Sequence, residues 1–137
     1  MPKKKSKYLY TPIIKNTPFY YHNSKFNLEI KESGIKNAGF GVFTNDFIPK
    51  NTFIDFYTGN YGINTLSGYY FQINETIGID AGEYPRCYMA MLNDAYKSKF
   101  KNNCDFVVKE YMVEVWSLSD IQPGHELLIS YGDDYFS

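Results

Sequence analysis

The sequence predicts a mostly β protein, with several short strands in small sheets and one or two short helices. From residue 26 onward, short runs of β-branched and aromatic residues alternate with turn residues. The chain contains 14 Tyr and 11 Phe among 137 residues, and many buried tyrosines need hydrogen-bond partners, which favours sheets over a plain helical core. One short stretch shows helical spacing of apolar side chains.

The elements follow one another along the chain with plausible turns between them. The expected strands are residues 27–30, 40–44, 52–57, 69–73, 77–80, 106–108, 111–118 and 126–131. The turn at 49–51 is expected to place Asn51 in the left-handed region. Gly124 suits the position of a tight turn that requires a positive φ. The helix is expected at about residues 85–92, with Pro85 in its first turn.

Length and composition fit one domain with a packed core, since 44% of the residues are hydrophobic and 21% are charged. We divide the chain into an N-terminal segment, residues 1–25, and a domain, residues 26–137. Lysines 3–5 are expected to form a flexible tip. Residues 8–21 are expected to lie on the domain, because their aromatic and Ile side chains should not stay exposed.

Composition also excludes several classes of function. A net charge of −1 argues against strong non-specific binding to nucleic acid. Two cysteines, Cys87 and Cys104, without a paired spacing exclude a zinc site built from cysteines, and we expect no metal. They allow either a disulfide or two free buried thiols. No apolar run approaches a membrane span, and no apolar stretch follows the first lysines, so we expect an intracellular protein.

Four segments carry motifs that are informative together. They are residues 33–43 (which contain Gly-Phe-Gly at 39–41), 55–59 (Asp-Phe-Tyr-Thr-Gly), 69–95 (which ends in Leu-Asn-Asp-Ala) and 120–131 (which ends in Ser-Tyr). In this order they resemble the SET family of lysine methyltransferases, over about residues 26–135. The resemblance implies a SET-type fold, in which the C-terminal segment packs through a knot-like arrangement.

The resemblance also implies methyl transfer from S-adenosylmethionine to a lysine side chain of another protein, most often a histone tail. Two alternatives stay open: a methyltransferase that acts on a non-histone protein, and a non-catalytic module that binds the cofactor or a peptide. Residues 130–136 are similar to the end of the compact viral SET proteins, which work as dimers. Because the chain ends soon after residue 131, we expect a homodimer that closes the lysine channel. A nuclear or chromatin-associated location fits a histone substrate.

The cofactor-binding residues implied by the resemblance are Gly39, Phe40, Gly41, Asn93 and Asp94. Two glycines around an aromatic residue let the backbone approach a ligand closely. Such a motif alone is better explained by a simple turn or bulge, and the later segments reverse that preference. Asn93 would also suit a helix C-cap. The family has His and Ser where this chain has Asp94 and Ala95. Glu126 matches an acidic position of the family, with a solvated surface carboxylate as the alternative.

The resemblance assigns catalysis to Tyr131, beside the transferred methyl group, and to Tyr57, which orients the target amine. Tyr69, Ile129 and Tyr135 are expected to line the substrate channel. Each tyrosine has the alternative role of an ordinary core or cross-strand aromatic residue. In the family, the residue two before the catalytic tyrosine often decides whether the pocket holds a water that blocks further methylation. Ile129 occupies this position and cannot hydrogen-bond such a water, which predicts transfer beyond the monomethyl stage.

Overall fold

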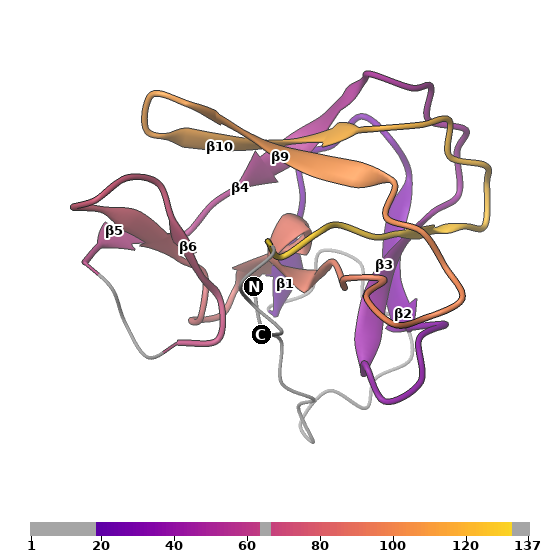
Figure 1. Cartoon of the computed structure of the whole chain (residues 1–137), viewed down its shortest axis with the longest axis horizontal. Helices are drawn as coiled ribbons and strands as arrows, with labels where there is room; N and C mark the ends of the chain where they lie inside the picture. The colour runs from indigo at the N-terminus through magenta and orange to yellow at the C-terminus, as the bar shows by residue number, and fades with distance from the viewer. Residues whose placement is uncertain (1–18, 64–66, 133–137) are drawn as a thin grey trace.

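The computed structural model describes residues 19–63 and 67–132, which form four small sheets around one hydrophobic core. In Figure 1 the single short helix of this part of the chain lies at the centre, with sheets above it and on both sides. The predicted mostly β class is therefore confirmed. Tyr135 and most of the predicted segment 8–21 lie outside the described residues.

Two of the sheets have three antiparallel strands and meet the helix directly. One has β3 (Phe40–Thr44) between β2 (Leu28–Glu32) and β11 (Glu126–Leu127). The other has β10 (Met112–Ser117) between β4 (Phe53–Tyr57) and β9 (Cys104–Lys109). Their inward residues supply much of the core, including Ile30, Val42, Ile54 and Val115.

The other two sheets are smaller. In the third, β7 (Gly78–Asp80) pairs with both β5 (Asn60–Gly62) and β6 (Tyr70–Gln72). In the fourth, β1 (Tyr20–Tyr21) pairs in parallel with β8 (Arg86–Cys87). Tyr20 is fully buried, so the described end of the N-terminal segment belongs to the same core, while the predicted boundary after residue 25 stays a prediction.

The predicted helix at residues 85–92 is wrong in length and type. The structure has a four-residue 3-10 helix, η1 (Tyr88–Met91), with extended residues on both sides. Arg86 donates its backbone N–H to Phe19 at 2.8 Å in the β1–β8 pairing, which keeps this part of the chain extended. The apolar spacing that suggested a helix instead reflects burial on all sides, because every residue of η1 is buried.

The C-terminal segment also differs from the prediction of one strand over 126–131. Only Glu126–Leu127 form a strand, and Leu128 and Ile129 make isolated bridges. The expected alternation of faces fails because Leu127, Leu128 and Ile129 are all buried. The two expected turn conformations are confirmed, with φ of 58° at Asn51 and 87° at Gly124.

The reason for this burial is that the segment passes between two earlier parts of the chain. On one side Ile129 donates its N–H to the Asn93 carbonyl at 2.9 Å. On the other side the N–H groups of Asn103 and Cys104 both donate to the Leu128 carbonyl at 2.9 Å. This threaded packing agrees with the expected knot-like arrangement.

The described residues also test the expectations about the two cysteines and about membrane-spanning segments. Cys87 and Cys104 are both buried free thiols, so the disulfide alternative is wrong. No helix in the described ranges has the length and apolar character needed to cross a membrane.

Candidate functional site

The first part of the site is a buried polar cluster where β3, β11 and the second residue after η1 meet. The Asn93 amide nitrogen donates to the Phe40 carbonyl at 3.1 Å and to Glu126 Oε2 at 3.2 Å. A Cβ on Gly41 would overlap with the Glu126 carboxylate and lie 3.1 Å from Asn93 Nδ2. The predicted residues Phe40, Gly41 and Asn93 therefore meet in space, and Gly41 is required because the carboxylate occupies the place of a side chain.

Glu126 is the residue of this cluster that the sequence did not identify as part of the site. The alternative of a solvated surface carboxylate is wrong, because Glu126 is only 9% exposed. Besides Asn93, it accepts hydrogen bonds from the Ser33 hydroxyl at 2.7 Å and the Gly34 N–H at 3.0 Å. These donors explain how a carboxylate is tolerated in a buried position. They lie more than 90 positions away in the sequence, so no local signal indicates them.

The second part of the site joins Asp94 to Tyr131. Asp94 Oδ2 accepts the Tyr131 backbone N–H at 2.8 Å, and the Tyr131 hydroxyl donates to the Leu92 carbonyl at 2.9 Å. Asp94 Oδ1 accepts from Asn102 Nδ2 and from the Tyr96 N–H, both at 3.0 Å. The predicted catalytic tyrosine is therefore bound to the two residues that flank Asn93 in the sequence.

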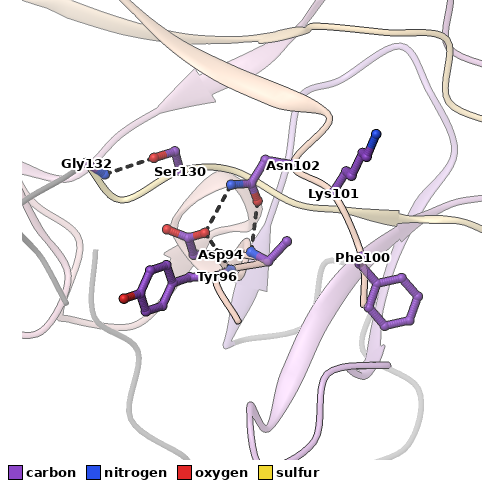
Figure 2. A pocket seen from close by; sticks show the side chains of 8 residues that line it. Asp94, Tyr96, Phe100, Lys101, Asn102, Ser130 and Gly132 are labelled. Carbon is purple, nitrogen blue, oxygen red and sulfur yellow. Dashed lines mark hydrogen bonds between the residues drawn. The ribbon is translucent and has the colours of Figure 1, made fainter. Parts of the chain in front are cut away.

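A cavity of about 340 Å³ opens beside Asp94. Figure 2 shows Asp94 and Asn102 close together, with Tyr96 and Ser130 nearby and Phe100 on the far side. Its walls therefore combine aromatic rings with hydrogen-bonding groups. Of the predicted cofactor residues, Asp94 lines this cavity, whereas Gly39, Phe40, Gly41 and Asn93 are not among its described lining residues.

The third part of the site is an aromatic group that contains Tyr57. The Tyr57 hydroxyl donates to the Tyr69 carbonyl, so the structure brings these two predicted channel residues together. The Tyr57 ring lies 5.8 Å from that of Phe71 and 6.2 Å from that of Phe106. Burial raises the pKa of Tyr57 well above its usual value, so its hydroxyl stays protonated at physiological pH. Ile129 is fully buried.

Arg86 lies under this aromatic group and was not predicted as a site residue. It is 5% exposed, and its guanidinium stacks on the Tyr69 ring at 3.7 Å from the centroid. Its Nε donates to the Ala81 carbonyl at 2.8 Å and its Nη2 to the Gly82 carbonyl at 2.6 Å. A fixed positive charge therefore stands beside Tyr69 and, through it, near Tyr57.

The arrangement suits an organic ligand better than a metal. Within residues 19–63 and 67–132 no group of His, Cys, Asp and Glu has the proximity needed to hold a metal ion. Backbone carbonyls and the Asn93 amide oxygen are acceptors of the kind that bind an amino group of a ligand. The aromatic rings of the cavity suit a planar heterocycle.

Comparison with known proteins gives a family match. The family model described as SET domain matches residues 39–132. This range contains the polar cluster, Asp94, Tyr131 and the aromatic group. No curated protein matches the sequence closely enough to count as a relative.

Similar solved structures share the fold. An active polycomb repressive complex 2 in the stimulated state has a chain that superimposes with a TM-score of 0.68 and 22% identity, over 79% of this chain and 15% of that chain. The Chaetomium thermophilum polycomb repressive complex 2 gives a TM-score of 0.68 and 22% identity, over 80% and 16%. A ctPRC2 in an autoinhibited conformation bound to S-adenosylmethionine gives the same score and identity, over 82% and 16%. This chain thus spans about one sixth of the length of those chains or less.

Proposed function

Because the chain belongs to the SET-domain family, we propose that it transfers methyl groups from S-adenosylmethionine to a lysine side chain of another protein. The observation that carries this proposal is that Tyr131 is hydrogen-bonded to Leu92 and Asp94, the two residues on either side of Asn93. One short segment would then hold both the side-chain amide that binds the cofactor and the phenol that contacts the acceptor amine. This would bring the methyl donor and the amine together.

The residues around this segment fit S-adenosylmethionine. We propose that Gly39, the Phe40 carbonyl, Gly41 and the Asn93 side chain hold its amino-acid end. Asp94 and the cavity beside it would hold the adenosine end, between Tyr96 and Phe100. One of the similar structures is described as bound to this same cofactor. When bound, the cofactor supplies a methyl group on a positively charged sulfur.

The protein residues would position the two reactants and exclude water. The Tyr131 and Tyr57 hydroxyls, with nearby carbonyls, would hold the lysine nitrogen and the methyl group in line, so that most of the rate gain comes from positioning. The Tyr69, Phe71 and Phe106 rings supply apolar walls for the lysine chain.

The target lysine must lose its proton before it can attack. A lysine with a pKa of about 10.4 withholds roughly 4 to 5 kcal/mol from the reaction at neutral pH. Desolvation in an aromatic channel lowers that pKa, and the fixed charge of Arg86 acts in the same direction. No strong general base is required in this mechanism, and a site made of tyrosines is suited to it.

The decisive experiment incubates the protein with methyl-labelled S-adenosylmethionine and a panel of histones and lysate proteins. Label should appear on lysine of at least one protein, and calorimetry should show binding of the cofactor to the protein alone. Cofactor binding without transfer to any protein would favour the non-catalytic alternative. A folded protein that does not bind millimolar cofactor would contradict the proposal.

The substrate we propose is a histone tail, with a non-histone protein as the alternative. The support is the frequency of histone substrates in the family and the polycomb complexes among the similar structures. A nuclear or chromatin-associated location would follow. Transfer to recombinant histones but not to other lysate proteins supports this choice, and the reverse result favours the alternative.

We also propose a homodimer. The support is the similarity of residues 130–136 to the end of the compact viral SET proteins, which work as dimers. Light scattering at micromolar concentration should give twice the mass of one chain. A fully active monomer would contradict this part of the proposal.

A further inference from the structure

We propose that Asp94 is a positioning residue for Tyr131, and that its carboxylate fixes where the tyrosine ring lies relative to the Asn93 amide. The consequence for catalysis rests on the proposed function. The positioning itself is a property of the fold and can be measured separately.

The segment 92–94 holds Tyr131 both at its backbone and at its hydroxyl. Its N–H donates to Asp94 Oδ2 at 2.8 Å, and its hydroxyl donates to the Leu92 carbonyl at 2.9 Å. Between these two anchors, the Asn93 carbonyl accepts the Ile129 N–H at 2.9 Å. The segment 92–94 thus supplies two anchors of Tyr131, and one of them is the Asp94 side chain.

The second carboxylate oxygen fixes Asp94 in turn. Oδ1 accepts from Asn102 Nδ2 and from the Tyr96 N–H, and Asn102 Oδ1 accepts the Ala95 N–H at 2.8 Å. Figure 2 shows this pairing of Asp94 with Asn102 at the edge of the cavity. The carboxylate is thus set between donors on both sides.

This arrangement requires an acidic residue. An ionised carboxylate accepts hydrogen bonds with both oxygens, whereas an amide or a neutral imidazole has one acceptor and one donor. Asparagine or histidine at position 94 would turn a donor toward Tyr131 on one side or toward Asn102 on the other. The departure from the family's histidine is therefore explained by what residue 94 contacts in this chain.

The test compares Asp94→Asn and Asp94→Ala with the wild-type protein. The amide keeps the shape of the side chain but loses one side of the clamp, and alanine loses both. Because Asp94 is also proposed to hold the adenosine end of the cofactor, kcat is measured at saturating S-adenosylmethionine for each variant. We expect kcat to fall about tenfold or more in Asp94→Asn and further in Asp94→Ala. The KM for the protein substrate should stay within about threefold, because the carboxylate acts on Tyr131 and not on the peptide.

A second measurement does not depend on activity. With 3-fluorotyrosine incorporated at position 131, the fluorine resonance should shift or broaden in Asp94→Asn, which reports a changed ring environment. If the wild-type protein proves not to transfer methyl groups, this signal still decides whether Asp94 positions Tyr131. Failure of the proposed function and failure of this inference are thus told apart.

An exchange of the two partners supplies a rescue. Asn102→Asp alone places two carboxylates face to face and should disturb the fluorine signal. Combined with Asp94→Asn, the new amide can direct its oxygen to the Tyr131 N–H and its nitrogen to the new carboxylate. The double variant should therefore recover part of both kcat and the wild-type fluorine signal, which a merely destabilised protein would not do.

The matched control is Asp46→Asn. Asp46 is also half-buried and accepts one backbone N–H from a distant residue, that of Asn27, at 2.7 Å. It lies in another loop, and an amide can keep its bond, so kcat and the fluorine signal should match wild type. Wild-type kcat and an unchanged signal in both Asp94 variants would overturn the proposal, as would a double variant worse than either single one.

Discussion

The hydrogen bonds of individual side chains explain why the described part of this small chain tolerates several buried charged groups. Glu126 receives three donors, and Arg86 is enclosed by carbonyls and aromatic rings. The Glu126 donors come from distant parts of the chain, whereas the carbonyls around Arg86 belong to residues 81 and 82, close to it in the sequence. Among the individual groups, the Tyr131 hydroxyl is the most informative, since it donates to the Leu92 carbonyl in the segment that contains Asn93.

We predict that Tyr131→Phe lowers methyl transfer about a hundredfold or more, because the hydroxyl that positions the reacting groups is lost. The ring is kept, so the free energy of unfolding should fall by only about 1 kcal/mol, the contribution of one hydrogen bond. Turnover assays and denaturant unfolding check both values. The control is Tyr111→Phe, whose ring is 58% exposed. Wild-type turnover in Tyr131→Phe would make Tyr131 a packing residue.

The buried Ile129 leads to a prediction about the number of methyl groups. Its side chain cannot hydrogen-bond a water, and a water without two or more polar partners is held poorly and gives way to a methyl group. We therefore expect di- or trimethyl-lysine, identified by mass spectrometry after many turnovers. Ile129→Tyr should shift the product toward monomethyl-lysine. A wild-type product that stays monomethylated would mean that another group anchors the water.

At the scale of elements, β3 and the C-terminal segment determine the site together. β3 pairs with β11 and presents the Phe40 carbonyl and Gly41, while the residues after β11 pass between Asn93 and Cys104. Neither element alone forms the polar cluster. Their contact depends on the absence of a side chain at one position of β3.

We predict that Gly41→Ala destabilises the protein by about 1 to 3 kcal/mol, because the new methyl group overlaps with the Glu126 carboxylate and must displace it. Cofactor affinity should fall in the same variant, since Asn93 shares that carboxylate. Denaturant unfolding and calorimetry measure the two effects. Gly62→Ala is the control, because nothing lies within 4 Å of its added methyl group. Equal stability of the two variants would contradict the assigned packing.

At the scale of the whole molecule, the described parts of four small sheets share one core instead of forming a single large sheet. The core contains groups that cannot ionise without cost. Burial raises the pKa of the Cys104 thiol, and the same cause raises those of Cys87, Tyr20 and Tyr57. The free energy of unfolding should therefore decrease as the pH rises into the alkaline range.

We predict that the free energy of unfolding is constant between about pH 7 and 8.5, and that it falls in the range above pH 8.5. In that range the unfolded thiols lose protons that the folded state retains, so stability decreases by up to about 1.4 kcal/mol per pH unit for each group. Above about pH 10 the buried tyrosines add to the slope. Denaturant unfolding between pH 7 and 10.5 measures it. Cys104→Ala should flatten the slope between pH 8.5 and 10, and an unchanged slope would contradict the assignment.

The sequence by itself determined the features that depend on neighbouring residues. The strands of the mostly β class were predicted from local runs, and the left-handed Asn51 and Gly124 from turn preferences, because sterics within a few residues decide these conformations. The order of motifs was sufficient to identify the family, whose model matches residues 39–132. The chemical roles of Tyr131, Tyr57 and the cofactor residues stay predictions.

The tertiary structure alone decided which polar groups are buried and what they contact. Glu126 was readable as a surface residue and residues 85–92 as a helix, because local sequence does not reveal that Ser33 or Phe19 will come to lie beside them. The same holds for Asp94, whose two oxygens meet Asn102 and Tyr131 only after the C-terminal segment has passed between residues 93 and 104. Burying a charge costs free energy unless distant donors satisfy it, and the fold alone brings those donors together.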